Sequence, residues 1–182
     1  MGSARLVHKR ALDLGLICAT LPVYGSVFAA CAALVRVVDG SPVFFAQVRV
    51  GRDRRRFTVL KLRTMSLERD ESARKPTRLG RVLRKRGLDE LPQFLNVIRG
   101  DMSLVGPRPL SEPDTERLLS QEPLLAKRFE VPPGITGLAQ VNGIRGAGPT
   151  AEADATYVAQ ASVRTDLRIL ARTVWINLVG KR

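Results

Sequence analysis

The sequence predicts an α+β fold, in which a long apolar N-terminal helix precedes a small, mainly helical domain with one short β-hairpin. Three observations lead to this prediction. Leu14–Val35 carries no charged residue. Two runs rich in Val and Phe, Val43–Val50 and Phe57–Leu62, flank a Gly-Arg-Asp turn. Apolar residues recur at helical spacing in several of the segments that follow. We divide the chain into a membrane element at 1–39 and one structural unit at 40–182.

The apolar N-terminal segment is long enough to be a membrane element. Its 22 residues would extend roughly 33 Å as an α-helix, which is about the thickness of the hydrocarbon layer. A cleaved signal peptide fits poorly, because the segment is too long and is followed by Arg36-Val37-Val38-Asp39 in place of small residues. Two topologies then remain: a spanning helix, and a re-entrant helix-break-helix that returns to the side it entered.

The flanking charges and one proline bear on this choice. His8–Arg10 precede the segment and Arg36 and Arg49 follow it, and basic flanks are typical of the cytoplasmic side. A spanning helix would place one basic cluster outside, whereas a re-entrant segment keeps both inside. Pro22 removes a backbone donor within the segment and can produce a bend. Proline kinks also occur in spanning helices, so the residues favour re-entry but leave both topologies open.

The remaining chain is predicted to form turns, loops and short helices. Gly40-Ser41-Pro42 ends the membrane element with turn residues. Ser66–Lys75 is predicted as a mobile polar loop and Asp101–Pro109 as a tight loop. Trp175 fits either an interfacial anchor or a core residue. The predicted helices are Leu79–Lys85, Leu88–Ile98, Glu112–Phe129 with an interruption at Pro123, and Ala151–Val179.

Composition narrows the chemistry. Thirty Lys and Arg against 17 Asp and Glu give a net charge of +13, which calls for an anionic partner: nucleic acid, an anionic membrane surface or a phosphorylated substrate. Cys18 and Cys31 have no CxxC spacing, and His8 is the one histidine, so a disulfide framework, a thiolate zinc site and a Ser-His-Asp triad are excluded. Catalysis would have to rest on carboxylates, arginines, lysines or a metal ion.

Two adjacent carboxylates, Asp89 and Glu90, form the most suggestive local cluster. The pattern predicts that Asp89 caps a helix whose first turn holds Glu90, Leu91 and Pro92. A capping aspartate needs no further role. The same geometry also suits chemistry, because a carboxylate at a helix start stays ionised and can act as a nucleophile. Its neighbour can hold Mg²⁺, which prefers oxygen ligands and substrate phosphates.

Cations and glycines surround this pair in the sequence. Arg84 precedes it, and Arg108 follows between two prolines that restrict its backbone. Arginine binds two phosphate oxygens with its planar guanidinium, although a surface arginine in a turn is the simpler interpretation of Arg108. In Pro133–Gly137 the glycines would allow the backbone to approach a ligand closely, or would serve only a turn.

These residues belong to a series of motifs that extends along nearly the whole chain. In their order and spacing, the motifs resemble those of the bacterial sugar transferase family, the small monotopic phosphoglycosyl transferases. The chain resembles the family's entry to its re-entrant helix, hairpin, basic strand end, catalytic dyad, Pro-Arg-Pro loop, glycine-rich segment and closing segment. The residues that carry these resemblances are Lys9–Asp13, Gly40–Gly51, Lys61–Met65, Leu88–Gln93, Gly100–Pro109, Pro133–Gly143, and Tyr157-Val158 with Ser162 and Asp166-Leu167.

The resemblance implies the reaction and the partners. Asp89 would attack the sugar-bearing phosphate of a UDP-sugar and release UMP, and a polyprenyl phosphate, undecaprenyl phosphate in bacteria, would then take the sugar phosphate from Asp89. Glu90 would bind Mg²⁺. We expect Lys61, Arg84, Arg108 and Arg145 to bind the substrate phosphates. The resemblance also implies Pro22 as the site of the re-entrant bend, interfacial amphipathic helices, and a place on the cytoplasmic face of the bacterial inner membrane.

Some features depart from the family pattern or leave alternatives. Leu21 stands where many members have Ser before the proline, Arg86-Gly87 precedes the dyad where Ser or Thr is frequent, and Ile144 separates Gly143 from Arg145. A membrane-tethered nucleic-acid-binding protein is the alternative class, but the basic region offers only Phe57 for base stacking, and we expect no nucleic-acid partner. An inactive scaffold is disfavoured by the intact pair. The sequence allows a homodimer without fixing the assembly.

Overall fold

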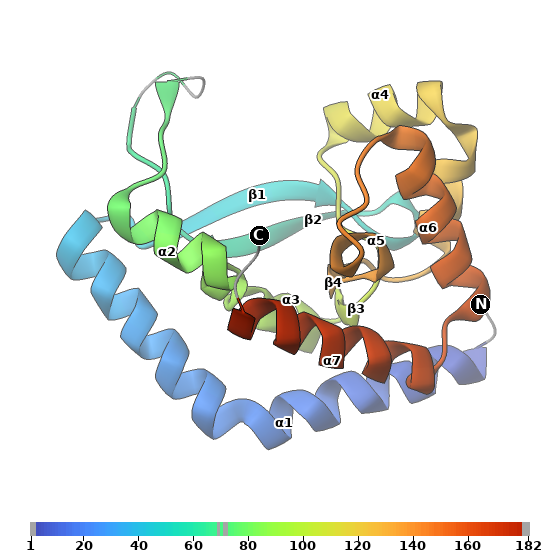
Figure 1. Ribbon diagram of the computed structural model, residues 1–182, viewed down its shortest axis with the longest axis horizontal. Helices are drawn as coiled ribbons and strands as arrows, with labels where there is room; N and C mark the ends of the chain where they lie inside the picture. The colour runs from blue at the N-terminus through green and yellow to red at the C-terminus, as the bar shows by residue number, and fades with distance from the viewer. Residues whose placement is uncertain (1–2, 69, 71–72, 180–182) are drawn as a thin grey trace.

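The computed structural model describes residues 3–68, 70 and 73–179. One long bent helix dominates its N-terminal part. Helix α1 (Ser3–Leu34) continues into a π-helical turn, η1 (Val35–Asp39), and Figure 1 shows its two halves running in different directions. Pro22 lies inside α1. The expected helix-break-helix is therefore a bent but continuous helix, because a single proline removes one backbone hydrogen bond without ending the helix.

Two hydroxyl groups beside Pro22 add to the bend. The Thr20 hydroxyl donates to the carbonyl of Leu16 at 2.7 Å, and the Ser26 hydroxyl donates to the carbonyl of Pro22 at 2.8 Å. Such bonds to a carbonyl one turn earlier often accompany helix bending. Within the described part of the chain, Leu6–Asp39 is the one helical stretch long and apolar enough to cross a membrane. The segment ends where the sequence predicted, while the membrane boundary at 39/40 stays a prediction.

The β-hairpin follows directly and matches the prediction to within a residue at each end. Strands β1 (Phe44–Val50) and β2 (Arg56–Leu62) pair antiparallel, with Phe44 opposite Leu62. The intervening turn, η2 (Arg52–Arg54), carries positive φ values. Part of the predicted loop Ser66–Lys75, at residues 69, 71 and 72, lies outside the described residues.

A second, smaller sheet is formed by part of the predicted tight loop Asp101–Pro109 and part of the glycine-containing segment Pro133–Gly137. Strands β3 (Ser103–Val105) and β4 (Gly134–Thr136) pair in parallel. A Cβ atom on Gly134 would lie 2.0 Å from the nitrogen of Gly106, and a Cβ atom on Gly137 would lie 2.2 Å from the carbonyl oxygen of Gly106. These glycines allow one backbone to approach another, and their close approach to a ligand stays a prediction.

Short helices make up the rest of the chain, and Figure 1 shows α3 and α7 lying inside the bend of α1. The predicted helix at Ala151–Val179 is split at residues 161–162, and the predicted break at Pro123 is present. The helical elements are α2 (Arg78–Arg86), η4 (Leu88–Glu90), α3 (Gln93–Arg99), α4 (Glu112–Gln121), η5 (Pro123–Glu130), α5 (Leu138–Val141), α6 (Ala147–Gln160) and α7 (Val163–Val179).

The start of α1 is held by a buried polar network in the same domain. Lys9 Nζ lies 2.6 Å from Asp166 Oδ2 in α7 and donates to the Tyr157 hydroxyl of α6 at 3.0 Å. Asp13 accepts the backbone N–H of Leu104 at 3.2 Å. Lys9, Asp13, Tyr157 and Asp166 are all buried. The first and last motifs of the sequence therefore meet in space.

The far end of α1 is held by the domain as well. The buried guanidinium of Arg63, just after β2, donates to the carbonyls of Asp39, Gly40 and Ser41. The Thr77 hydroxyl, which precedes α2, donates to the Asp39 carboxylate at 2.8 Å. Both ends of the apolar helix thus contact one globular unit.

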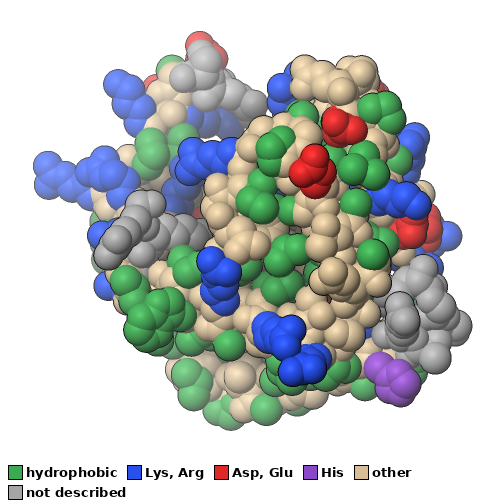
Figure 2. Space-filling model, turned by 45° about the vertical axis from the view of Figure 1, so that its right-hand side comes forward, with side chains coloured by type: hydrophobic (Ala, Val, Ile, Leu, Met, Phe, Trp, Pro, Cys, Tyr) green, Lys and Arg blue, Asp and Glu red, His purple; other side chains and the backbone are tan. Residues whose placement is uncertain are grey.

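Several large apolar side chains face outward. Leu95 and Ile98 of α3 are exposed, whereas its buried positions are Gln93, Asn96 and Val97. Trp175 is 68% exposed, so the core interpretation of this residue is wrong and the interfacial one stays a prediction. On the face in Figure 2, hydrophobic side chains reach the surface along the lower part of the molecule, where α1 lies in Figure 1.

Candidate active site

The Asp89–Glu90 pair lies in a 3₁₀ turn and does not cap a helix. Gly87, in the left-handed region with φ of 69°, ends α2, and η4 begins directly after it. Pro92 has no N–H to give to the carbonyl of Leu88, so the chain uses shorter bonds such as Leu91 N–H to Leu88 at 3.3 Å. Helix α3 starts only at Gln93. The expected cap at Asp89 is therefore wrong, although the pair does stand immediately before the helix.

Side chains from distant parts of the chain fix this turn and α3. Asn96 donates to the carbonyl of Thr58 at 2.7 Å and so joins α3 to the hairpin. Arg10 donates to the carbonyls of Val97 and Ile98 at the end of α3. The Tyr24 hydroxyl, from the second half of α1, donates to the Leu91 carbonyl at 2.6 Å. The first half of α1 therefore contacts α3, and the second half contacts the residue that follows the carboxylates.

The two carboxylates have different surroundings. Asp89 is buried, and this burial raises its pKa, as does the adjacent charge of Glu90, while Lys61 and Arg84 act in the opposite direction. Glu90 Oε1 lies 3.1 Å from Lys61 Nζ and 3.2 Å from Arg108 Nη1. Lys61 and Arg108 thus hold Glu90 by charge-assisted bonds, and Asp89 lies beside them.

A pocket of about 630 Å³ opens at Asp89 and is lined mainly by cations and apolar groups. Burial and the neighbouring charge of Arg108 lower the pKa of Arg49, which also lines the pocket. Guanidinium groups brought this close repel each other, so an anion between them is favoured. The charged residues of the lining are Arg49, Lys61, Arg63, Arg74, Arg84, Asp89 and Arg108, and its apolar residues include Phe44, Phe45 and Leu67. The geometry suits a phosphorylated ligand with an apolar part.

The loop that carries Arg108 is held from behind by a pair that the sequence did not reveal. Arg128 of η5 is buried and donates to the Arg108 carbonyl at 2.5 Å. It also lies 3.3 Å from Asp154 of α6. Burial raises the pKa of Asp154 to about 6, although the charge of Arg128 acts in the opposite direction. Arg128 and Asp154 lack a fixed sequence spacing, so a local pattern could not have identified them.

The predicted phosphate-binding residues are brought together with one exception. Lys61, Arg84 and Arg108 line the pocket that contains Asp89. Arg145 is exposed in the turn between α5 and α6 and is not among the residues that line this pocket. Its role in phosphate binding stays a prediction.

The carboxylates suit a magnesium ion held partly by a substrate. No cluster of three or more His, Cys, Asp or Glu side chains is found among the described residues, so a cage built by the protein alone is absent there. Mg²⁺ usually takes one or two carboxylates together with substrate phosphates. Asp89 and Glu90, adjacent to each other and beside the cationic pocket, match that donor set.

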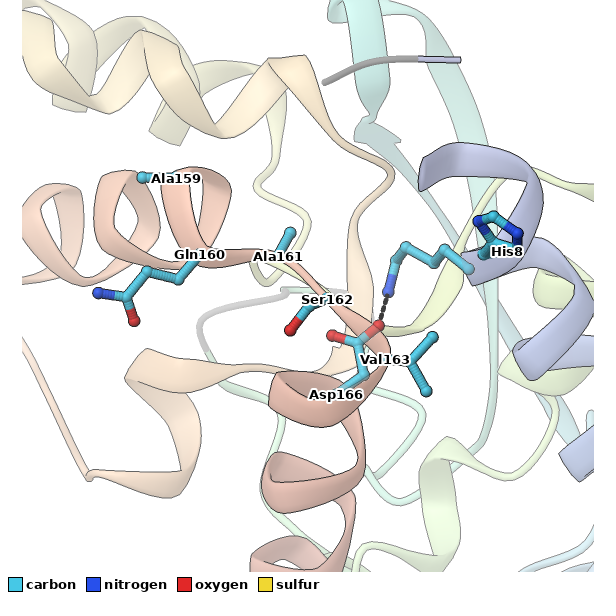
Figure 3. A pocket seen from close by; sticks show the side chains of 8 residues that line it. His8, Ala159, Gln160, Ala161, Ser162, Val163 and Asp166 are labelled. Atoms are coloured by element: carbon cyan, nitrogen blue, oxygen red, sulfur yellow. Dashed lines mark hydrogen bonds and ion pairs between the residues drawn. The ribbon is translucent and has the colours of Figure 1, made fainter. Parts of the chain in front are cut away.

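A separate pocket of about 350 Å³ lies at the seam between α1 and α7. In Figure 3 His8 lies across it from Ser162 and Asp166, and the dashed line marks the ion pair between Lys9 and Asp166. Lys9, the lysine of this pocket, already pairs with the carboxylate of Asp166, with Nζ 2.6 Å from Oδ2. We therefore assign this seam to the docking of α1.

Comparison with known proteins agrees with this geometry. The sequence model of the bacterial sugar transferase family matches residues 4–180. A UDP-glucose:undecaprenyl-phosphate glucose-1-phosphate transferase of Caulobacter vibrioides is 38% identical over 92% of this chain and 68% of its own length. The sugar transferase EpsL of Bacillus subtilis, named as uncharacterized, is 42% identical over 97% of this chain and 90% of its own length.

A longer relative shows the same similarity over part of its length. A UDP-glucose:undecaprenyl-phosphate glucose-1-phosphate transferase of Escherichia coli is 37% identical over 95% of this chain and 40% of its own length. The similarity to proteins named as sugar-phosphate transferases thus covers nearly all of this chain, including the basic pocket, the two carboxylates and the long apolar helix. The chain belongs to the bacterial sugar transferase family.

Proposed function

We propose that this chain is a phosphoglycosyl transferase, which moves a sugar-1-phosphate from a UDP-sugar to undecaprenyl phosphate in the first membrane step of glycan assembly. The observation that carries the proposal is the placement of buried Asp89 beside Lys61, Arg84 and Arg108 in one pocket. The relatives named for this reaction support the donor and acceptor classes. Both substrates are anionic at the reacting centre, which suits the cations of the pocket.

In the first half-reaction, an oxygen of the Asp89 carboxylate attacks the phosphorus that carries the sugar. A bond forms between this oxygen and phosphorus, and the bond from phosphorus to the bridging oxygen breaks. UMP leaves with the electron pair. Lys61, Arg84 and Arg108 stabilise the phosphate charge during the displacement, as charge-assisted contacts do in phosphoryl transfer. The product is a sugar-phosphoryl aspartate.

In the second half-reaction, a phosphate oxygen of the lipid acceptor attacks the same phosphorus. The bond to Asp89 breaks, the carboxylate is regenerated, and the lipid leaves as a polyprenyl-diphospho-sugar. No proton or redox partner is needed to balance either step. The exposed Phe44 and Phe45 at the pocket offer an apolar path for the lipid chain beside the phosphate site.

We propose Mg²⁺ as the cofactor, held by Glu90 together with the substrate phosphates. When bound, it would neutralise charge on the transferring phosphate. Lys61 and Arg108 contact Glu90 Oε1 at 3.1 and 3.2 Å and would orient this carboxylate. Asp89 stays available for the attack on phosphorus.

We further propose that α1 is re-entrant and that the domain lies on the cytoplasmic face of the inner membrane. Lys9 and Asp13 at one end of the helix, and Asp39 at the other, contact the same domain. A straight spanning helix of this length would carry one end to the opposite side. Outward-facing Leu95, Ile98 and Trp175 suit contact with the interface.

The first prediction tests the nucleophile. Asp89→Asn should lower UMP release by at least about a thousandfold, because loss of a nucleophile removes the covalent route. It should also abolish the mass increment of one sugar phosphate that the wild-type protein shows with a UDP-sugar alone. The assay uses a panel of UDP-sugars with undecaprenyl phosphate. Asp53→Asn, at an exposed carboxylate in the hairpin turn, is the matched control and should retain activity.

The role of Asp89 and the role of the metal are tested separately. UMP release by Asp89→Asn within tenfold of the wild type would show that Asp89 is not the nucleophile. A chelator should stop the wild-type reaction, and added Mg²⁺ should restore it. Full activity in the chelator would remove the metal from the proposal while leaving the role of Asp89 intact.

A further inference from the structure

A smaller pocket of about 100 Å³ adjoins the phosphate site. Arg108 lines both pockets, whereas Asp89 lines the larger one and Glu90 the smaller one. The smaller pocket extends from Glu90 to the C-terminal part of α7, where Thr173, Ile176 and Asn177 line it. A ligand whose phosphate lies at Arg108 therefore has two different pockets within reach.

The two pockets differ in charge. The larger pocket carries six Lys and Arg side chains, as its lining shows. Among the described residues that line the smaller one, Glu90 and Arg108 are the charged groups, and the others are neutral. Thr136, Gln140, Thr173 and Asn177 supply hydroxyl and amide groups there. The Thr136 and Thr173 hydroxyls lie 2.7 Å apart.

The neutral lining also has an apolar side. Ile135, Val141 and Ile176 line the smaller pocket beside the hydroxyl and amide groups. Small-ligand sites commonly combine apolar walls with a few placed polar groups that fix orientation. A neutral sugar has many hydroxyl groups and no charge, so it matches this lining, whereas a nucleotide matches the cationic pocket.

We infer that the smaller pocket receives the sugar of the donor, a neutral hexose or N-acetylhexosamine, and that Thr173 and Asn177 determine which sugar is accepted. This inference rests on the proposed function. The volume of about 100 Å³ is several times what one water needs, about 10–15 Å³. It accepts one edge of a hexose ring with its hydroxyl or acylamino substituent, and the rest of the ring lies toward Arg108.

The two pockets would have different roles in the two half-reactions. UMP leaves the cationic pocket, and the lipid phosphate enters it, while the sugar stays attached through phosphate to Asp89. The sugar therefore occupies the smaller pocket in both half-reactions. Its contacts there set the selectivity for the donor without contributing to the binding of UMP.

The test compares sugar selectivity with nucleotide binding. Thr173→Val removes a hydroxyl at constant shape, and Asn177→Leu removes an amide. kcat/KM is measured for UDP-glucose, UDP-galactose, UDP-N-acetylglucosamine and UDP-N-acetylgalactosamine, with UMP as a competitive inhibitor. We expect the ratio of kcat/KM between at least two sugars to change about tenfold or more, since polar pockets discriminate strongly by hydrogen bonding. The inhibition constant of UMP should stay within about twofold.

Controls separate selectivity from folding. Thr173→Ser keeps the hydroxyl and should keep the wild-type ratios, and Thr165→Val, on the same helix but outside the pocket, should do the same. If Asn177→Leu melts far below the wild type, the Thr173 variants alone decide.

Three results would overturn the inference, and the third would overturn the proposed function as well. Equal changes of kcat/KM for all four sugars, including no change, would show that the pocket does not contact the sugar. A parallel rise in the inhibition constant of UMP would place the nucleotide there instead. A folded wild-type protein that releases UMP from no UDP-sugar overturns the proposed function itself, and the inference with it.

Discussion

At the scale of single residues, the two adjacent carboxylates have opposite surroundings. Burial is the largest cause that raises the pKa of Asp89, and the charge of Glu90 is the second, while Lys61 and Arg84 lower it. A carboxylate attacks phosphorus only when it is ionised. With a folded-state pKa above the ordinary value of 3.8, Asp89 becomes ionised at a higher pH than a free aspartate. The proposed nucleophilic role of Asp89 therefore predicts a loss of activity as pH falls through the raised pKa.

This gives a pH prediction for the first half-reaction. The rate of UMP release without acceptor should fall on acidification with an inflection above pH 3.8. Omitting the lipid phosphate matters, because phosphate monoesters themselves titrate near pH 6. In Glu90→Gln the residual activity should have its inflection at lower pH, since one of the charges that raise the pKa of Asp89 is gone. Glu116→Gln, at an exposed position of α4, is the control. An inflection that stays or moves upward would contradict this assignment.

The sequence predicted those site residues that lie in short motifs, and it missed those that depend on contacts between distant segments. Lys61, Arg84, Asp89 and Arg108 were predicted from short motifs, and the fold brings them to one pocket. Arg128 and Asp154 were missed, because their contact joins η5 to α6 and has no signature in spacing. The predicted cap at Asp89 was wrong because Pro92, three residues later, deprives an α-turn of its hydrogen bond.

At the scale of secondary-structure elements, segments with a long apolar run or a clear residue pattern were predicted, whereas very short strands were not. The hairpin strands were predicted to within a residue at each end from their Val and Phe content between turn residues. The end of the long helix was predicted to within a residue from its apolar run, but α1 begins at Ser3, well before the predicted start at Leu14. β3 and β4 have three residues each, which is too short for a pattern. Their pairing depends on Gly106, Gly134 and Gly137, whose missing Cβ atoms let the backbones meet.

The bend of α1 is the element on which a mutation should have the clearest effect. Pro22→Ala restores a backbone donor and should straighten the helix. Spin labels at Val7 and Leu34, both exposed, would report this in a background with Cys18 and Cys31 changed to Ala. A straight helix separates these positions by about 40 Å, and the bent helix should give a shorter distance. Activity should also fall, because straightening moves Tyr24 away from the Leu91 carbonyl.

The comparison variant for this element is Tyr24→Phe. It removes the 2.6 Å hydrogen bond to Leu91 and keeps the bend, so the distance between the labels should not change. If Pro22→Ala gives the same distance distribution and full activity, the proline does not enforce the bend. The hydroxyls of Thr20 and Ser26, and the contacts at the two ends of α1, would then hold it.

At the scale of the whole molecule, charge and apolar surface work together. A net charge of +13 suits an anionic lipid surface, and the outward apolar side chains of α1, α3 and α7 suit its interface. The same domain contacts α1 at Lys9 and at Asp39. A spanning arrangement would require one of these contacts to break, and with it the buried network around Tyr157 or the bonds from Arg63.

The re-entrant topology that we propose from these contacts can be measured directly. Ser3, at the start of α1, and Ser41, after η1, are each changed to Cys in the background without Cys18 and Cys31. A membrane-impermeant thiol reagent is added to intact cells, with the outer membrane made permeable where one is present. If both positions lie on the cytoplasmic side, as we propose, neither should react until the inner membrane is lysed. Reaction of only one position before lysis would mean that the helix spans the bilayer, and reaction of both would place the domain on the outer face, away from cytoplasmic UDP-sugars.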